Sequence, residues 1–209
     1  MEEKLDNKTP FLLISFVVDN GPSMTEERLN SLTEAFKRFA ESEKSVRLEW
    51  ELLSFGAFAS TVNKSFDSNE IKPVSPDRFP LLGRTVSTAV DRLAARAAKL
   101  RDGGEELYRP WMFILSDGFT MDDMREATAR LDAMEKGGEL LYLPFKLTPK
   151  LLTERLQRLD RNKHIVEISA GQLDGFFAFV QRMIERRGAL SPDVGIKFAK
   201  TDFEGWAVL

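Results

Sequence analysis

Two short apolar runs, each followed at once by an aspartate, most constrain what this chain can fold into. Phe11–Val18 (FLLISFVV) leads into Asp19, and Trp111–Ser116 (WMFILS) leads into Asp117. Short, nearly continuous apolar runs are typical of strands that are buried on both faces of a parallel sheet. A sheet of this kind needs helices on both faces, so we expect an α/β domain.

Helical segments are predicted between these strands by apolar residues that recur at spacings of three and four. Leu29, Leu32, Phe36 and Phe39 form one such face. The same spacing predicts a helix from Thr85 to about residue 100, and others over residues 124–134, 151–159 and 173–186. The alternation of strands and helices predicts an open, doubly wound sheet that is mostly parallel, with helices on both faces.

The remaining segments differ from this pattern. Residues 46–52 alternate between apolar side chains and Arg47, Glu49 and Glu51, which predicts a half-exposed strand. A turn at Gly56 is expected to lead into a short antiparallel strand within residues 57–62. Further strands are expected at residues 139–145 and 164–169. Residues 67–83 contain three prolines and are predicted to form a long loop.

The length of 209 residues favours a single domain over residues 1–209. Residues 1–10 are polar and are expected to form a flexible N-terminus. Residues 188–209 show no clear period, but they end in the apolar GWAVL. We therefore expect a C-terminal extension that packs back on the domain, with an edge strand as one form of it.

Composition excludes several classes of function. The net charge of -3 argues against nucleic-acid binding, and the absence of cysteine excludes disulfides and thiolate chemistry. The single histidine, His164, excludes a site built on several imidazoles. No apolar run approaches the roughly 20 residues of a membrane span, and the N-terminus lacks the apolar core of a signal peptide. We expect a cytoplasmic protein.

Four oxygen-bearing side chains are expected to meet at one edge of the sheet. Ligands of doubly wound sheets bind at the carboxyl ends of the strands, where Asp19 and Asp117 lie. Ser23 follows the first strand, and Thr85 begins a helix on the same edge. Carboxylate and hydroxyl oxygens are the ligands that magnesium, manganese and calcium prefer.

Each residue also has a structural interpretation. Ser23 with Glu26 matches a capping box, Thr85 suits a helix N-cap, and Asp117-Gly118 is a common turn pair. Asp122 and Asp123 suit the start of a helix. Against this, two carboxylates at one strand edge repel each other unless a cation or a hydrogen-bond donor lies between them.

Several motifs resemble a known family. The segment DNGPSM, which begins at Asp19, resembles the Asp-x-Ser-Gly-Ser-Met signature of von Willebrand factor A (VWA) domains, and LLGRT, which ends at Thr85, resembles their threonine loop. The segment YRPWMFILSDGFTMDD at residues 108–123 is similar to the bacterial tellurite-resistance-type branch, as are FFAFVQRMIE and the late GW. The similarity covers nearly the whole chain in the expected order.

The resemblance implies a Rossmann-like VWA fold with a metal-ion-dependent adhesion site. It places Asp19, Ser23, Thr85 and Asp117 on the ligands of Mg²⁺ or Mn²⁺. It also implies a non-enzymatic protein-interaction module of a bacterial stress or defence system, whose partner supplies an acidic side chain. Contacts with that partner are expected from Asn20, Gly21 and Arg84, and from the loop at 67–83.

The sequence departs from the family pattern at two positions. Gly21 stands where the family has its first serine, so one hydroxyl ligand is missing. Arg84 stands beside Thr85 where the family usually has glycine. The guanidinium either pairs with Asp19 or Asp117 in place of a cation, or points into solvent and leaves a weak metal site.

An alternative from another class is a magnesium-dependent phosphohydrolase with Asp19 as its strand-end carboxylate. Haloacid-dehalogenase-like enzymes require a second aspartate two residues later, where this chain has Gly21. A nucleotide-binding function lacks support, because neither a Gly-x-Gly-x-x-Gly after the first strand nor a Walker loop occurs.

Overall fold

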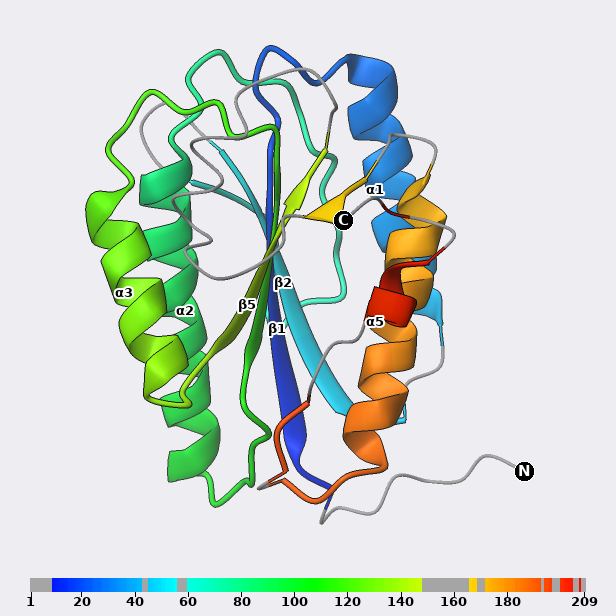
Figure 1. The fold of residues 1–209 in the computed structure, drawn as a ribbon, viewed down its shortest axis with the longest axis vertical. Helices are drawn as coiled ribbons and strands as arrows, with labels where there is room; N and C mark the ends of the chain where they lie inside the picture. Colours follow the sequence, from blue (N-terminus) through cyan, green and yellow to red (C-terminus); the bar gives the residue numbers. More distant parts are fainter. Residues whose placement is uncertain are drawn as a thin grey trace.

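A sheet lies between two pairs of helices in this protein (Figure 1). The structure is a computed structural model that describes residues 9–42, 45–55, 60–147, 166–168, 172–192, 194–196, 200–204 and 207. Helices α2 (Leu82–Asp102) and α3 (Arg125–Lys136) cover one face of the sheet, and α1 (Glu26–Glu41) and α5 (Leu173–Gly188) cover the other. The predicted α/β class is confirmed.

The sheet has six strands in the order β3-β2-β1-β4-β5-β6. All neighbours are parallel except the pair of β2 and β3. The strands are β1 (Phe11–Val18), β2 (Arg47–Ser54), β3 (Thr61–Lys64), β4 (Trp111–Ser116), β5 (Leu141–Lys146) and β6 (Val166–Glu167). The predicted mostly parallel, doubly wound sheet with one short antiparallel strand is therefore confirmed, although that strand, β3, begins at Thr61, near the end of the predicted range of 57–62.

The order of the strands reverses at the pair of β1 and β4. From β1 the chain first winds outward to β2, and later returns to place β4 on the other side of β1. The two strands are in register, with Val18 opposite Leu115. Their carboxyl ends therefore lie side by side at the topological switch point, where ligands of such sheets bind.

The continuous apolar character of β1 follows from burial on both faces. Phe16 lies on the α1 and α5 face, where its ring centroid is 5.0 Å from that of Phe36 and 5.4 Å from that of Phe113. Leu13 and Val17 lie on the opposite face and belong to the cluster beneath α2 and α3. Removing both faces of a strand from water leaves no position for an exposed polar side chain.

Some predicted segments fall outside the described residues. These are the turn at Gly56, the helix at 151–159, His164 and most of the flexible N-terminus. The described part of the C-terminal extension contacts the domain, because the ring of Phe203 packs against that of Phe179 of α5 with centroids 5.1 Å apart. None of the described helices is long and apolar enough to cross a membrane.

The polar face of β2 corrects one prediction. The strand was expected to be half-exposed, and its first three residues are partly exposed, but α2 covers Glu49 and Glu51 on its charged face. Glu51 is fully buried and accepts hydrogen bonds from Ser15 at 2.8 Å and from Arg92 of α2 at 2.7 Å. Glu49 pairs in the same way with Arg96. The alternation in the sequence shows two faces, but it does not show that long arginine side chains of a helix close over one of them.

The buried pair between Glu51 and Arg92 generates a prediction about stability. Burial raises the pKa of Glu51, although the hydrogen bonds from Arg92 and Ser15 and the charges of Arg92 and Lys64 act against that rise. Substitution of Arg92→Met leaves this carboxyl without its hydrogen-bonded charged partner, and we expect a loss of about 2 to 3 kcal/mol in the free energy of unfolding. Urea denaturation measures the change.

The matched control is Lys37→Met, which removes an exposed pair with Glu34 and should cost about 0.5 kcal/mol or less. The double variant Glu51→Leu with Arg92→Met should recover part of the loss, because the buried carboxyl that has lost its arginine is removed as well. Equal effects of Arg92→Met and Lys37→Met would contradict the prediction.

Candidate functional site

The carboxylate of Asp19 is the centre of the strand-end site. Asp19 follows β1 directly and is only 1% exposed. Its Oδ1 accepts a hydrogen bond from the Gly21 N–H at 2.7 Å. Its Oδ2 accepts from the Ser116 hydroxyl at 2.8 Å and from the Asp117 N–H at 3.2 Å. One carboxylate thus joins the ends of two adjacent strands.

Asp117 follows β4 and is also 1% exposed. Its Oδ1 accepts from the Phe119 N–H at 2.6 Å, and Gly118 has a φ of +84°. That φ favours glycine, so the expected turn at Asp117-Gly118 is confirmed. The turn does not exclude a role at the site, because the carboxyl of Asp117 still lies close enough to act on Asp19.

The electrostatics of the pair are unfavourable. Burial, and after it the charge of Asp117, raise the pKa of Asp19 from 3.8 to about 7. The groups that oppose this rise are the hydrogen-bond donors Gly21, Ser116 and Asp117, and no lysine or arginine of the described chain is among them. A buried, uncompensated pair of carboxyl groups is the environment in which a divalent cation binds favourably.

The two predicted hydroxyl ligands differ in their surroundings. Ser23 is half-buried, and its hydroxyl forms no hydrogen bond with the described residues. The capping box proposed for it is wrong, because Thr25 is the N-cap of α1 and accepts from the Arg28 N–H at 3.4 Å. Ser23 therefore keeps its oxygen available to a ligand.

Thr85 is buried in the first turns of α2. Its hydroxyl donates to the Leu81 carbonyl at 2.9 Å and accepts from the Ser60 hydroxyl at 3.2 Å. The interpretation of Thr85 as an N-cap is wrong, since α2 begins earlier, at Leu82. The oxygen of Thr85 already has two partners, so the hydrogen bond from Ser60 would have to break before this oxygen could bind a metal.

The first turn of α2 is capped from another loop. Asp122 accepts from the Gly83 N–H at 3.1 Å and from the Arg84 N–H at 2.7 Å, and Thr120 accepts from the Leu82 N–H at 3.0 Å. The sequence predicts that Asp122 lies at the start of a helix. This is confirmed, but the helix that it caps is α2 and not α3, which follows it in the chain. Nothing in the local sequence shows this contact between distant segments.

The three predicted partner-binding residues lie at different depths. Arg84 is exposed, and its guanidinium is not among the groups that shift the pKa of Asp19. Arg84 is therefore not a charge partner of Asp19 in this structure, and its relation to Asp117 stays a prediction. Asn20 is 2% exposed and donates to the carbonyls of Phe55 at 3.1 Å and Ser75 at 2.7 Å. Gly21 is also buried, so for Asn20 and Gly21 a contact with a partner stays a prediction.

The donors present fit a weakly held hard cation. No group of three or more acidic, histidine or cysteine side chains that could hold a metal occurs among the described residues. A cation here would be held by Asp19 and Asp117 together with hydroxyl and water oxygens. The buried carboxyl pair supplies the charge, and Ser23 supplies a hydroxyl that no described residue engages.

Comparison with known proteins supports the fold. No protein-family model and no curated protein matches the chain. Proximal thread matrix protein 1 from the mussel byssus superposes with a TM-score of 0.59 at 13% identity, covering 86% of this chain and 47% of that one. This chain thus spans about half the length of the mussel protein. A second crystal form of that protein gives the same TM-score.

The SpRpn10 VWA domain superposes with a TM-score of 0.52 at 12% identity, and the match covers 80% of this chain and 94% of that domain. At this level of identity the comparison supports the fold and nothing more specific. The fold is VWA-like, as the sequence motifs implied, and the tellurite-resistance-type branch stays a prediction.

The raised pKa of Asp19 predicts how stability depends on pH. The folded state holds a proton on Asp19 up to about pH 7, whereas the unfolded chain releases it near pH 3.8. The folded state therefore binds more protons in this window, and the free energy of unfolding falls as pH rises. With about 1.4 kcal/mol for each pKa unit, the fall approaches roughly 4 kcal/mol.

Asp19→Asn should flatten this dependence, because the amide resembles the protonated carboxyl and cannot ionise. Urea denaturation at pH 5 and pH 7.5, in buffer with a chelator, measures it. The exposed Asp174→Asn serves as the control and should keep the wild-type slope. A wild-type protein that gains stability over this window relative to Asp19→Asn would contradict the sign.

Proposed function

We propose that this chain is a non-enzymatic protein-interaction module that binds its partner at the edge formed by the ends of β1 and β4. The observation that carries the proposal is the buried pair of Asp19 and Asp117 at the topological switch point of a VWA-like sheet. Two buried carboxyl groups that lie close together repel each other and lose their hydration, so the pair by itself lowers the stability of the fold. Its retention at the ligand-binding edge is explained by a cation and a partner that bind there.

The proposed cation is Mg²⁺ or Mn²⁺, held by Asp19, Ser23, Thr85 and Asp117. The hydroxyl of Ser23 has no hydrogen-bond partner among the described residues. Burial, and after it the charge of Asp117, raise the pKa of Asp19, and a cation would offset both effects. Such a cation can accept a carboxylate of the partner as a further ligand. The partner is therefore proposed to be a protein that presents an acidic side chain.

The sequence motifs extend the proposal to a bacterial stress or defence system. The segments DNGPSM and YRPWMFILSDGFTMDD support this assignment, and the VWA-like fold agrees with it. The module would act in the cytoplasm by bringing a partner to this edge.

Calorimetric titration with MnCl₂ tests the metal site. The wild type should bind Mn²⁺ weakly, at millimolar concentration or below, and Arg84→Gly should change the affinity by less than about threefold, since the arginine lies outside the carboxyl pair. A wild type that shows no heat with Mn²⁺, beside an Arg84→Gly variant that does, would overturn this expectation.

The position of Gly21 offers a sharper test of the missing hydroxyl. A Cβ added at Gly21 would lie 3.0 Å from Asp19 Oδ1, so any side chain here presses on the carboxylate. Gly21→Ala introduces that pressure alone, and Gly21→Ser adds the hydroxyl. We expect Gly21→Ser to bind Mn²⁺ about tenfold more tightly than Gly21→Ala, which is roughly 1.4 kcal/mol for the added ligand. Equal affinities would show that residue 21 does not face the cation.

An assay with p-nitrophenyl phosphate and Mg²⁺ separates this proposal from the phosphohydrolase alternative. We expect no turnover by the wild type above that of Asp19→Ala. Turnover that is lost in Asp19→Ala would make the carboxylate a nucleophile or base and would contradict the non-enzymatic assignment.

A further inference from the structure

Ser116 is a buried polar residue that the predicted set of ligands does not include. It ends β4 and is fully buried. Its hydroxyl donates to Asp19 Oδ2 at 2.8 Å and accepts from the Gly118 N–H at 3.0 Å. One hydroxyl is therefore bonded to one predicted ligand and to the residue that follows another, Asp117.

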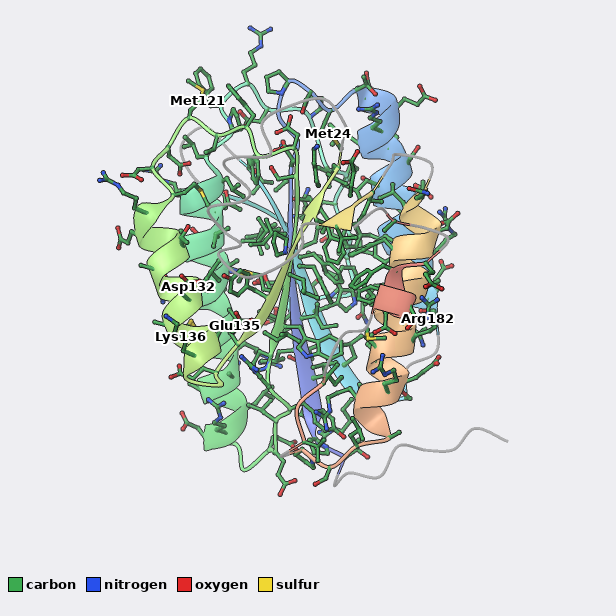
Figure 2. The ribbon with its side chains drawn as sticks, viewed as in Figure 1. Met24, Met121, Asp132, Glu135, Lys136 and Arg182 are labelled. Atoms are coloured by element: carbon green, nitrogen blue, oxygen red, sulfur yellow. The ribbon has the colours of Figure 1, made fainter. Side chains whose placement is uncertain are left out.

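The hydroxyl of Ser116 lies where the loops after β1 and β4 meet. The Asp19 N–H donates to the Leu115 carbonyl at 2.8 Å, which continues the pairing of the two strands beyond the end of β1. Met24 of the first loop and Met121 of the second lie at the same end of the molecule (Figure 2). Ser116 therefore links the two loops that supply three of the four predicted ligands.

The hydrogen bonds of Asp19 make its two carboxylate oxygens unequal. Oδ2 accepts from two donors, the Ser116 hydroxyl and the Asp117 N–H, whereas Oδ1 accepts from a single described donor, the Gly21 N–H. A carboxylate oxygen has about two acceptor positions. Oδ2 is therefore filled, and Oδ1 is the oxygen that has a position left for a cation.

The serine hydroxyl is the closer of the two donors to Oδ2. It lies 2.8 Å from this oxygen, whereas the Asp117 N–H lies at 3.2 Å, which is at the long end of the range for such bonds. The backbone N–H is present whatever side chain follows β4, but the hydroxyl depends on the residue at position 116. The orientation of the Asp19 carboxylate is therefore set by a side chain and not by the fold alone.

Groups that hydrogen-bond to the ligands of a metal determine how those ligands are oriented. Their removal typically lowers metal affinity by about 10- to 100-fold. Without the hydroxyl of Ser116, the Asp19 carboxylate would be free to rotate. The Gly118 N–H would also lose its acceptor, which would loosen the turn that carries Asp117.

We propose that Ser116 is a positioning residue of the proposed cation site, which holds Asp19 by Oδ2 and leaves Oδ1 to the cation. Its own oxygen is engaged by Asp19 and Gly118, so we do not count it among the ligands. This inference rests on the proposed function, since it requires that the edge binds Mg²⁺ or Mn²⁺.

Ser15 offers a matched control in the neighbouring strand. It is also fully buried, and its hydroxyl donates to a buried carboxylate, Glu51 Oε1, at the same distance of 2.8 Å. Glu51 pairs with Arg92 of α2 and is not a predicted ligand. Ser116→Ala and Ser15→Ala thus each remove one buried hydrogen bond from a serine to a carboxylate, but only Ser116→Ala removes it from the proposed site.

Titration with MnCl₂, followed by the electron paramagnetic resonance signal of free Mn²⁺, measures the affinity of the wild type and of both variants. Ser116→Ala should bind Mn²⁺ at least about tenfold more weakly than the wild type. Ser15→Ala should bind like the wild type, because its hydrogen bond lies in a separate cluster. Urea denaturation in metal-free buffer should show that both variants fold and lose stability to a similar degree.

A second substitution covers the case in which Ser116→Ala does not fold. Ser116→Cys keeps a side chain of similar size, but its thiol is only a weak donor. It should therefore weaken Mn²⁺ binding as alanine does, and Ser15→Cys is then its control.

The failures of the two proposals are distinguishable. Equal affinities of the variants at residues 116 and 15, or tighter binding by the variant at 116, would overturn the positioning role and leave the cation site in place. Loss of affinity in both variants would also overturn that role, because affinity would then follow overall stability. A wild type that binds no Mn²⁺ would overturn the proposed cation and this inference together.

Discussion

The hydrogen bond from the Ser116 hydroxyl to Asp19 is the contact on which the arrangement of the edge depends. It joins the residue that ends β4 to the residue that follows β1, and the Asp117 N–H reinforces it on the same oxygen. A buried carboxylate is stable only with several donors. Here they come from both strand ends at the switch point, so the position of Asp19 and the alignment of β1 with β4 are determined together.

The same contact extends to the loops. The Ser116 hydroxyl accepts from the Gly118 N–H at 3.0 Å, which sets the turn that begins the loop between β4 and α3. That loop then carries Thr120 and Asp122 to the first turn of α2, where their oxygens accept backbone N–H groups. The negative charge of Asp122 at this helix terminus is favourable for the helix dipole. The edge is thus a network of hydrogen bonds that holds α2 beside the carboxyl pair.

The periodic parts of the fold could be predicted from the sequence, and contacts between distant segments could not. The apolar runs of β1 and β4 and the spacing of Leu29, Leu32 and Phe36 were sufficient, because burial imposes a period on each element. The placement of Asp19 and Asp117 at one edge followed from topology alone. Local patterns failed where two nearby residues could both cap a helix. The sequence favoured Ser23 as the N-cap of α1, but Thr25 caps it.

Glu51 shows the same limit in the core. A glutamate in an alternating strand indicates exposure, unless a helix residue far along the chain neutralises it, as Arg92 does. Asp122 likewise carries no local sign that it caps α2. These contacts are electrostatic and depend on single side chains, whereas the hydrophobic pattern averages over many positions and is therefore more robust.

Burial and hydrogen bonding act in opposite directions on the charge of this edge. Burial and the charge of Asp117 favour a proton on Asp19, whereas the donors Gly21, Ser116 and Asp117 favour its ionised form. Electrostatic interactions strengthen where water is excluded, since the effective dielectric constant falls. The repulsion between two carboxyl groups is therefore larger at this buried edge than it would be at the surface, and neutral donors offset it only in part. A cation at the edge would relieve the remaining repulsion, whereas a mutation that exposes the edge to water would weaken both the repulsion and the hydrogen bonds.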